Sequence, residues 1–323
     1  MANPSSTDAA ARRPYQMKRV FFIVGPTATG KSEIAAEIAS QLNAEIINAD
    51  AFQIYRGLDR LTAKPEQATL VKAPHHLLSG VSPSEEMNVE KFRAAAAAAI
   101  RDIQARGKLA IVAGGSGLYV KALTHGLSRL PAADPQLRAQ LNELSLDQLC
   151  QQLIDLDPEA AHWIDLKNPR RVARALEICL LTSRPASEQR TQGGAAAAVR
   201  APAGIFVFRE RVELYQRIDR RVEKMFADGV VEEVRALRDI GSTAEKALGL
   251  REIRALLAGE ISETECIAKI QQATRRYAKR QLTWFQRQDI FEPLNLSSHG
   301  FPEAIELIMA QTPKAFGVAQ TDD

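Results

Sequence analysis

The chain has 323 residues, 46% hydrophobic and 25% charged, which indicates a globular protein with one large domain carrying an insertion, or with two domains. Its 42 basic and 39 acidic residues give a net charge of +3, too small to indicate nucleic acid as a partner without further observations. No apolar run is long enough for a membrane span, and the three cysteines form no CxxC pair of the kind that binds zinc.

The two ends of the chain are predicted to be flexible tails, residues 1–17 and 311–323. The first tail is polar and rich in alanine, and it lacks the apolar core of a signal peptide. We therefore expect a cytoplasmic protein with no membrane partner, and we expect a monomer.

A phosphate-binding loop is predicted at GPTATGKS, which runs from Gly25 to Ser32. An apolar run, Val20–Val24, precedes it, and apolar residues at helical spacing follow it. This strand, loop and helix context is the one that a P-loop requires, and it disfavours an ordinary glycine turn. Backbone N–H groups and the helix N-terminus would bind phosphate, Lys31 would reach a terminal phosphate, and Ser32 would bind Mg²⁺. The motif predicts a diphosphate or polyphosphate without identifying the molecule that carries it.

Two further loops follow apolar runs that are predicted to be strands. The run that begins at Glu45 ends at Asp50, which could be a metal ligand, a general base or a helix cap. The run Leu109–Ala113 leads into Gly114-Gly115-Ser116-Gly117, which we interpret as a second wall of the same phosphate site. Between them a helix is predicted over 88–106, preceded by the pair His75 and His76. Adjacent strand residues point to opposite faces, so this pair is not expected to bind one ion.

The middle of the chain, residues 133–203, is predicted to be a mostly helical insertion. Four basic residues and no acid lie between Lys167 and Arg174. They form either a solvated helix face or a surface for an anionic partner. Residues 193–198, with two glycines and four alanines, are predicted to be a loop.

The strand-like run Ile205–Phe208 is predicted to rejoin the first sheet, and two helices follow it. The first begins near Glu213, and Arg217 lies off its apolar stripe, where it could reach a cleft. The second covers 264–288, and aromatic residues alternate there with five bases. Such a face either binds nucleic acid or has its aromatics in the core and its bases in solvent. Together these elements predict a P-loop NTPase-like α/β core with a parallel sheet, residues 18–132 and 204–310, interrupted by the helical insertion.

The motifs, in their order, resemble those of the tRNA dimethylallyltransferases, also called isopentenyltransferases. The matching segments are GPTATGKS, DAFQIYRGLD, TAKP, PHHLL, GGSGLY, ADP followed by Arg138, RRVARALE, LYQRIDRR and TRRYAKRQLTWF. No C-terminal zinc finger is recognised, so the bacterial type of the family is indicated.

The resemblance implies transfer of a dimethylallyl group from dimethylallyl diphosphate to N6 of the adenosine just 3′ of the anticodon in tRNA. It implies a donor site, with Mg²⁺ bound by Ser32, made of Gly25, Pro26, Thr27, Ala28, Thr29, Gly30, Lys31, Ser32 and Arg217. Asp50 would take the proton of the adenine amino group, with Thr27, Ser116 and Arg217 also catalytic.

The acceptor adenosine would be flipped into a channel, where Gln53 would read its edge. The resemblance implies contacts with the tRNA anticodon stem-loop from Asp50, Ala51, Phe52, Gln53, Ser116, Arg138, Arg170, Arg171, Val172, Ala173, Arg174, Arg275, Lys279 and Arg280. Arg275, Lys279 and Arg280 would lie along the tRNA or at the diphosphate entrance.

The sequence departs from the family pattern at a few positions. Ala51 replaces a serine, Leu61 replaces a glycine before TAKP, and Leu250 replaces a tyrosine. Ser116 replaces a threonine and keeps its hydroxyl. The first three changes put local geometry, tRNA contacts and rate in doubt.

Three other functions remain open from the sequence. A P-loop kinase of small molecules would bind ATP, but it gives no role to the basic clusters. A prenyltransferase acting on free AMP or ATP would need no long helical insertion. A non-catalytic RNA-binding protein is disfavoured by the intact Lys31, Ser32, Asp50 and Arg217.

Overall fold

The computed structural model describes residues 19–127, 130–131, 133–192 and 203–312. By internal contacts the chain divides into two compact units, one made of Met1–Thr124 with Val199–Asp323 and the other of His125–Ala198. We call them the core unit and the helical unit. The predicted tail at 1–17, residues 313–323 of the second tail, and the predicted loop at 193–198 lie outside the described residues.

A parallel sheet is the centre of the core unit, as the sequence predicts, and within the described residues it has six strands. Its strands are β1 (Val20–Val24), β2 (Glu45–Asn48), β3 (His75–His76), β4 (Ala110–Gly114), β5 (Ala203–Phe208) and β6 (Glu292–Asn295). Their spatial order is β3-β2-β4-β1-β5-β6. The sequence analysis missed β6, because this edge strand is short, polar and contains Pro293.

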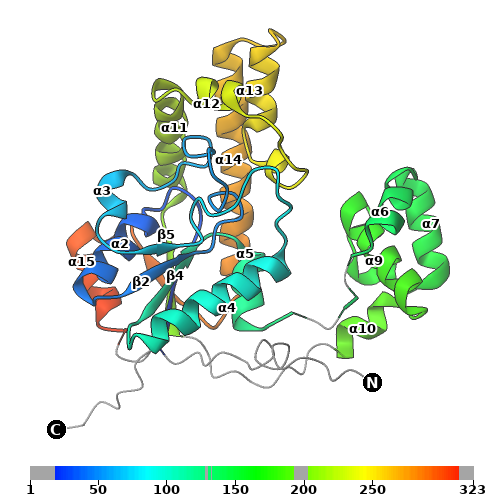
Figure 1. Ribbon diagram of the computed structural model, residues 1–323, viewed down its shortest axis with the longest axis horizontal. Helices are drawn as coiled ribbons and strands as arrows, with labels where there is room; N and C mark the ends of the chain where they lie inside the picture. The colour runs from blue at the N-terminus through cyan, green and yellow to red at the C-terminus, as the bar shows by residue number, and fades with distance from the viewer. Residues whose placement is uncertain (1–18, 128–129, 132, 193–202, 313–323) are drawn as a thin grey trace, which may run out of the picture. The chain divides into compact units, whose positions relative to one another are not determined.

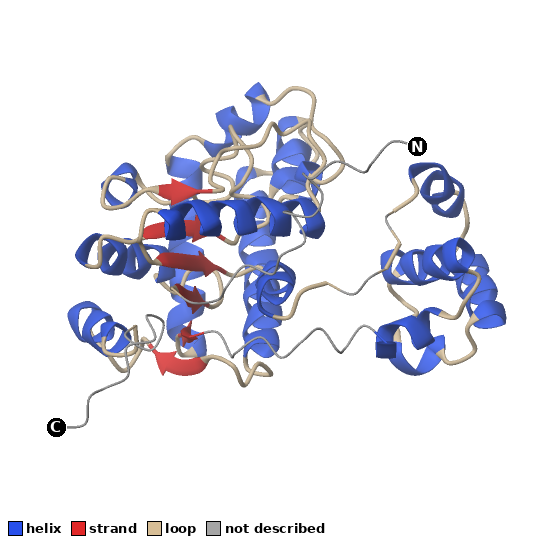
Figure 2. Ribbon diagram, turned by 60° about the horizontal axis from the view of Figure 1, so that its bottom comes forward, coloured by secondary structure: helices blue, strands red, loops and turns tan. Residues whose placement is uncertain are grey.

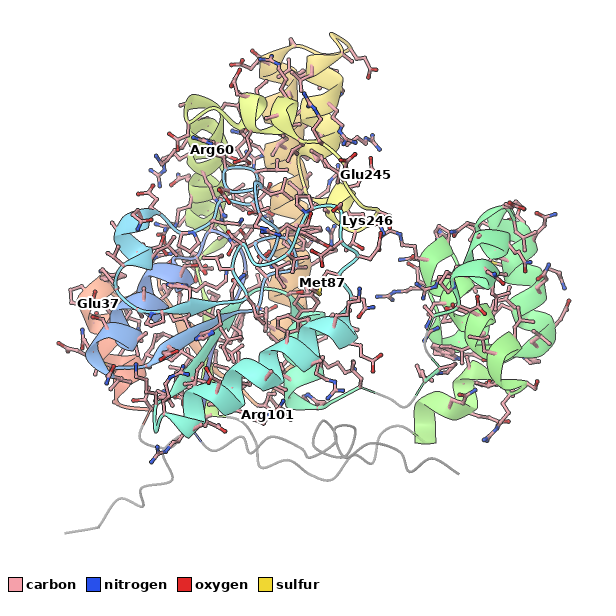
Figure 3. All side chains as sticks on the ribbon, in the orientation of Figure 1. Glu37, Arg60, Met87, Arg101, Glu245 and Lys246 are labelled. Carbon is pink, nitrogen blue, oxygen red and sulfur yellow. The ribbon has the colours of Figure 1, made fainter. Side chains whose placement is uncertain are left out.

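Helices cover both faces of the sheet, which explains why β1 and β4 are apolar throughout (Figures 1 and 2). Alternate residues of β1 enter different apolar clusters, with Phe21 on one face and Phe22 on the other. The first face is covered by α2 (Lys31–Gln41) and α15 (Phe301–Met309). The second is covered by α4 (Val89–Ala105), α5 (Gly117–Thr124) and α14 (Glu263–Phe285). On the first face Lys72 pairs with Glu37 of α2, which is labelled in Figure 3.

A third apolar cluster lies beyond the carboxyl edge of the sheet and gives that edge its outer wall. It joins the loop after β2, which holds Tyr55 and Leu61, to α11 and α14. The helices and turns of this region are α3 (Gln67–Leu70), α11 (Arg211–Ala227), α12 (Val230–Ala236), the 3₁₀ turn η2 (Ala244–Lys246) and α13 (Leu250–Leu257). Because α11 packs along α14, polar side chains of both helices can reach the loops that follow the strands.

The helical unit contains α6 (Pro135–Asn142), α7 (Leu146–Leu156), α8 (Ala160–Trp163), α9 (Pro169–Thr182) and α10 (Ala186–Gln192). Asp134, Ser145 and Asn168 cap the N-termini of α6, α7 and α9 with their side chains, which fixes where each of these helices begins. The unit has its own core, in which α7 and α9 pack together.

Among the described helices, none has both the length and the apolar character that crossing a bilayer demands.

Candidate active site

Four loops meet at the carboxyl edge of the sheet. They follow the neighbouring strands β2, β4, β1 and β5, and parallel strands direct their carboxyl ends to one edge. A cavity of about 860 Å³ opens there. Its lining includes the P-loop, Asp50, Gln53 and several bases of α11. Arg60, from the loop after β2, also lines it and is labelled in Figure 3. The fold therefore brings the predicted P-loop and the predicted acid to one cavity.

The shape of the P-loop depends on a close backbone contact and on hydrogen bonds from its own side chains. Gly25 is required because a Cβ atom there would lie 2.1 Å from the carbonyl oxygen of Val207. Thr29 Oγ1 and Lys31 Nζ each donate to the carbonyl of Pro26, both at 3.0 Å. Gly30 starts α2 in the left-handed conformation at φ 96°, and no side chain caps this helix. The first N–H groups of α2 are thus open to an anion.

Lys31 faces the cavity in an unusual electrostatic environment. Burial lowers the pKa of Lys31 to about 8, while the nearby carboxylate of Asp50 opposes that shift and Arg221 adds to it. A bound anion would favour the ammonium form, so Lys31 is poised to respond to a negatively charged ligand.

Two arginines contact the P-loop, one from the loop after β5 and one from α11. Arg217 Nε donates to the carbonyl of Ala28, and Arg209 Nε donates to the carbonyl of Thr29, both at 2.8 Å. Burial lowers the pKa of Arg217, and the charge of Arg209 lowers it further. Arg217 lies where the sequence predicts it, beside a cleft. Arg209 was missed, although a base directly after an apolar strand was a signal that could have identified it.

Asp50 has one of the roles that the sequence left open, that of a cap, and it also lies at the cavity. Its Oδ1 accepts from the backbone N–H groups of Phe52, at 2.9 Å, and Gln53, at 3.2 Å, as in a capping turn. The side chain also lines the cavity. Within the described residues both of its side-chain hydrogen bonds use Oδ1, which leaves Oδ2 for a ligand.

Gln53 lines the cavity beside Asp50, and its amide is held by the loop that it precedes. Its Nε2 donates to the carbonyls of Thr62, at 3.1 Å, and Ala63, at 3.2 Å. Its neighbours Ala51 and Phe52 are not part of the cavity lining.

The second glycine turn forms a wall of the cavity through Ala113 and Gly114. A Cβ atom at Gly114 would lie 2.3 Å from the carbonyl of Ala49, so glycine allows the loops after β4 and β2 to touch. Ser116 is not part of the lining, and its N–H donates to the carbonyl of Ala49 at 3.2 Å. The predicted role of its hydroxyl stays a prediction.

Two side chains that the sequence analysis missed hold Thr27 in the P-loop. Gln281 of α14 accepts from the Thr27 N–H at 2.9 Å and donates to the carbonyl of Gly115 at 2.8 Å. Arg221 of α11 donates to Thr27 Oγ1 at 2.7 Å. Arg221 lies one helical turn after Arg217, so the i, i+4 spacing was the available signal.

The bases predicted on α14 have different surroundings. Arg275 makes two hydrogen bonds with Asp219 of α11, at 3.0 and 2.5 Å, and thereby joins two helices of the core unit. Lys279 and Arg280 are exposed, and Arg280 lies over the ring of Tyr277 at 5.7 Å. None of these three bases lines the cavity.

The bases predicted in the helical unit also divide into two kinds. Arg138 and Arg174 both pair with Glu177, which is fully buried. Arg170 and Arg171 are exposed. The side chains of Val172 and Ala173 pack in or against the core of the unit.

The histidine pair behaves as two separate residues. His76 Nε2 lies 2.8 Å from Glu45 Oε2, whereas His75 Nε2 is buried and has no hydrogen-bond partner among the described residues. Across the described ranges, no three His, Cys, Asp or Glu side chains are grouped as a metal site would need.

Comparison with known proteins shows which family this chain is similar to. A family model described as IPP transferase matches residues 53–288. A tRNA dimethylallyltransferase of Akkermansia muciniphila is 42% identical over 291 residues, which are 90% of this chain and 98% of the relative. One from Citrifermentans bemidjiense is 44% identical over 275 residues, which are 84% of this chain and 90% of the relative.

Solved structures show the same similarity. A tRNA isopentenylpyrophosphate transferase of Bacillus halodurans superposes with a TM-score of 0.67 at 34% identity, covering 93% of this chain and 97% of the other. A eukaryotic dimethylallyltransferase solved while acting on tRNA gives a TM-score of 0.77 at 26% identity, covering 92% of this chain and 79% of the other.

Proposed function

The chain belongs to the IPP transferase family, and from this membership we propose that it moves a dimethylallyl group from dimethylallyl diphosphate to tRNA and releases diphosphate. The acceptor is N6 of the adenosine just 3′ of the anticodon. The observation that carries this proposal is that one cavity joins a cationic phosphate loop to the carboxylate of Asp50. An alkyl transfer needs both, because one group leaves as an anion while the other loses a proton.

The donor diphosphate binds at the P-loop. Negative charge grows on the diphosphate as the bond between carbon and oxygen breaks. The open N–H groups at the start of α2, the ammonium of Lys31 and the guanidinium of Arg217 stabilise that charge. Arg209, which pairs with Glu213, supports the loop through the carbonyl of Thr29. Hydrogen bonds within the protein fix Lys31 and Arg217, so little rearrangement is needed as charge develops in the transition state.

Mg²⁺ is the cofactor that we propose for this site. It prefers oxygen ligands and diphosphate oxygens, and the hydroxyl of Ser32 lines the cavity at the start of α2. When bound, Mg²⁺ neutralises charge on the departing diphosphate. The residues present fit such an ion, since Ser32 supplies an oxygen next to the loop that binds phosphate.

Asp50 acts as the general base. The adenine amino group is a weak nucleophile because its lone pair is delocalised into the ring. As the bond between N6 and carbon forms, Asp50 Oδ2 takes a proton from N6, and the diphosphate leaves with the electrons of the broken bond. The adenosine reaches Asp50 only after flipping out of the anticodon loop, and Gln53 contacts its edge.

The tRNA contacts are proposed on the exposed bases. Arg170 and Arg171 of the helical unit, and Lys279 and Arg280 of α14, have charge available for phosphates. Arg138, Arg174 and Arg275 contribute mainly through the ion pairs that support these surfaces. The predicted insertion boundaries at 133–203, the cytoplasmic location and the monomeric state stay predictions.

A labelling experiment tests the proposal. The purified chain is incubated with Mg²⁺, labelled dimethylallyl diphosphate and an unmodified tRNA anticodon stem-loop, and label on the RNA is measured. A stem-loop with guanosine in place of the acceptor adenosine is the matched control and should stay unlabelled. Parallel reactions with AMP or ATP test the free-nucleotide alternative, and phosphate release from ATP without the donor tests the kinase alternative. Label on AMP or ATP with none on the stem-loop would contradict the proposal.

A further inference from the structure

The two threonines of the P-loop use their hydroxyl groups differently. Thr29 is fully buried, and its Oγ1 donates to the carbonyl of Pro26 at 3.0 Å. Thr27 lines the cavity instead, and its Oγ1 accepts a hydrogen bond from Arg221 Nη1 at 2.7 Å. The hydroxyl of Thr29 therefore closes the loop, while that of Thr27 faces the space where a ligand would bind.

The contact with Arg221 determines where the Thr27 proton can point. A guanidinium group only donates, so Thr27 cannot donate its proton back to Arg221. In the part of the chain that is described, no acceptor for this proton is recorded. The Thr27 backbone N–H is held by Gln281 at 2.9 Å, which restrains the residue as a whole. Its hydroxyl proton is thus available to an acceptor in the cavity that Thr27 lines.

Arg221 is itself held in place. Its Nη2 donates to the carbonyls of Thr62, at 3.2 Å, and Ala63, at 3.0 Å. Gln53 donates to the same two carbonyls. Arg221 therefore connects the loop that would bind diphosphate to the loop that would contact the adenine. Burial lowers the pKa of Arg221, and the charge of Asp50 opposes that shift, but a guanidinium stays protonated in proteins.

We propose that Arg221 is a positioning residue that directs the Thr27 hydroxyl proton toward the oxygen leaving with the diphosphate. This inference rests on the proposed function. The hydrogen bond from Thr27 strengthens as charge builds on that oxygen, so it contributes more in the transition state than in the bound donor. Loss of one preorganised donor of this kind lowers kcat about 10²–10³-fold in other enzymes.

A double-mutant cycle separates this role from general support of the fold. Arg221→Gln and Thr27→Val should each lower kcat about 10–10²-fold and change the KM for tRNA less than about threefold. The double variant should be no more than about threefold slower than the slower single variant, because Arg221 acts through the hydroxyl that Thr27→Val has already removed. In a Thr27→Ser background, which keeps the hydroxyl, Arg221→Gln should again lower kcat about tenfold or more.

Thr29→Val is the matched control, because it removes the hydroxyl that closes the loop. The fold-loss in kcat from Thr29→Val and that from Arg221→Gln should multiply in the double variant. If Arg221→Gln loses its cooperative thermal transition, Arg221→Lys replaces it in the same cycle, since one ammonium cannot hold Thr27 and both carbonyls together.

The possible outcomes separate this inference from the proposed function. Two results would overturn the role of Arg221 while the wild-type chain still prenylates tRNA. One is a double variant whose loss in kcat equals the product of the two single losses from Arg221→Gln and Thr27→Val. The other is a kcat of Arg221→Gln near the wild-type value. A wild-type chain that labels no tRNA overturns the proposed function instead.

Discussion

At the residue scale, the site gathers like charges before any ligand is bound. Lys31, Arg209, Arg217 and Arg221 lie around one loop, and burial lowers the pKa of three of them, Lys31, Arg217 and Arg221. Such an arrangement costs folding stability and prepares the loop for an anion. The proposed donor diphosphate is an anion that would relieve this repulsion.

The pH dependence of donor use follows from Lys31. Its pKa of about 8 in the folded chain means that the ammonium is present below pH 8 and is lost as the pH rises through that value. Donor binding above pH 8 must take up a proton, so the KM for dimethylallyl diphosphate should rise by up to tenfold per pH unit between about pH 8 and 10. Steady-state kinetics across this range measure the effect. Lys31→Arg keeps its charge and should flatten the profile, and a wild-type KM constant from pH 7 to 9.5 would contradict the assignment.

Replacement of Asp50 tests the general base. Asp50→Asn keeps an oxygen for the backbone N–H groups of Phe52 and Gln53 but removes the basic carboxylate. We expect kcat to fall about 10²–10⁴-fold with little change in tRNA affinity. Single-turnover rates and a filter-binding titration measure the two quantities. Turnover near the wild-type value would show that Asp50 is not the base.

Two departures from the family pattern have a packing explanation at this scale. Leu61 and Leu250 are both buried in the apolar cluster behind the loop after β2. A Cβ atom at Gly249 would lie 3.1 Å from Leu61 Cδ1, so the two segments are in close contact. Both leucines therefore support the loop that carries Gln53 and do not enter the cavity. Nothing in the structure explains Ala51.

At the element scale, α9 illustrates how an ion pair organises a basic helix. Glu177 accepts from Arg138 and Arg174, and also from the N–H of Asp134. Burial alone would raise the pKa of Glu177, but the hydrogen bonds from Arg174 and Arg138 keep it below its ordinary value. These contacts hold the start of α6 against α9, while Arg170 and Arg171 of α9 are exposed and make no ion pair among the described residues.

Glu177→Gln should destabilise the helical unit. It leaves two guanidinium groups without their carboxylate, and we expect a loss of about 2 kcal/mol in the free energy of unfolding near pH 7. Because the pKa of Glu177 is lowered on folding, this contribution is present above about pH 4.5 and disappears as the pH falls through the folded value. Hydrogen exchange of the α9 amides measures the change. Glu188→Gln, in an exposed pair with Arg184, is the control and should change the stability by less than about 0.5 kcal/mol.

At the whole-molecule scale, the chain has two units with separate cores, and the proposed function assigns a different task to each. The core unit contains the cavity, and the helical unit presents exposed bases far from the P-loop in the sequence. This division predicts that affinity for tRNA and the rate of the chemical step can be changed independently.

Charge reversal on the helical unit tests this division. Arg170→Glu with Arg171→Glu should weaken tRNA binding at least about tenfold and lower the slope of log affinity against log salt by about 1–2. The single-turnover rate at saturating tRNA should stay within a few-fold of wild type. Fluorescence titrations at several salt concentrations measure affinity and slope. Arg184→Glu, at another exposed base of the same unit, is the control, and equal losses from both variants would indicate a nonspecific charge effect.

The sequence by itself determined the features that local patterns encode. The P-loop, the strands β1, β2, β4 and β5, the position of Asp50 after a strand and the long helices α4 and α14 all follow from runs of adjacent residues. Hydrophobic periodicity is local, because it depends only on which face of an element is buried. The parallel sheet was predictable for the same reason, since strands alternating with helices admit few arrangements.

Only the tertiary structure decided which polar groups meet. Thr27 is held by Arg221 and Gln281, which lie 194 and 254 residues away in the chain. In the sequence, Arg275 and Arg174 look equally available for contact with tRNA. In the structure, Arg275 pairs with Asp219 of a neighbouring helix and Arg174 pairs with Glu177 of its own helix. The ion-pair partner of a charged residue on the polar face of a helix cannot be read from the neighbouring sequence, because it depends on which helix packs alongside. In the candidate active site, the packing of α11 along α14 determines these partners.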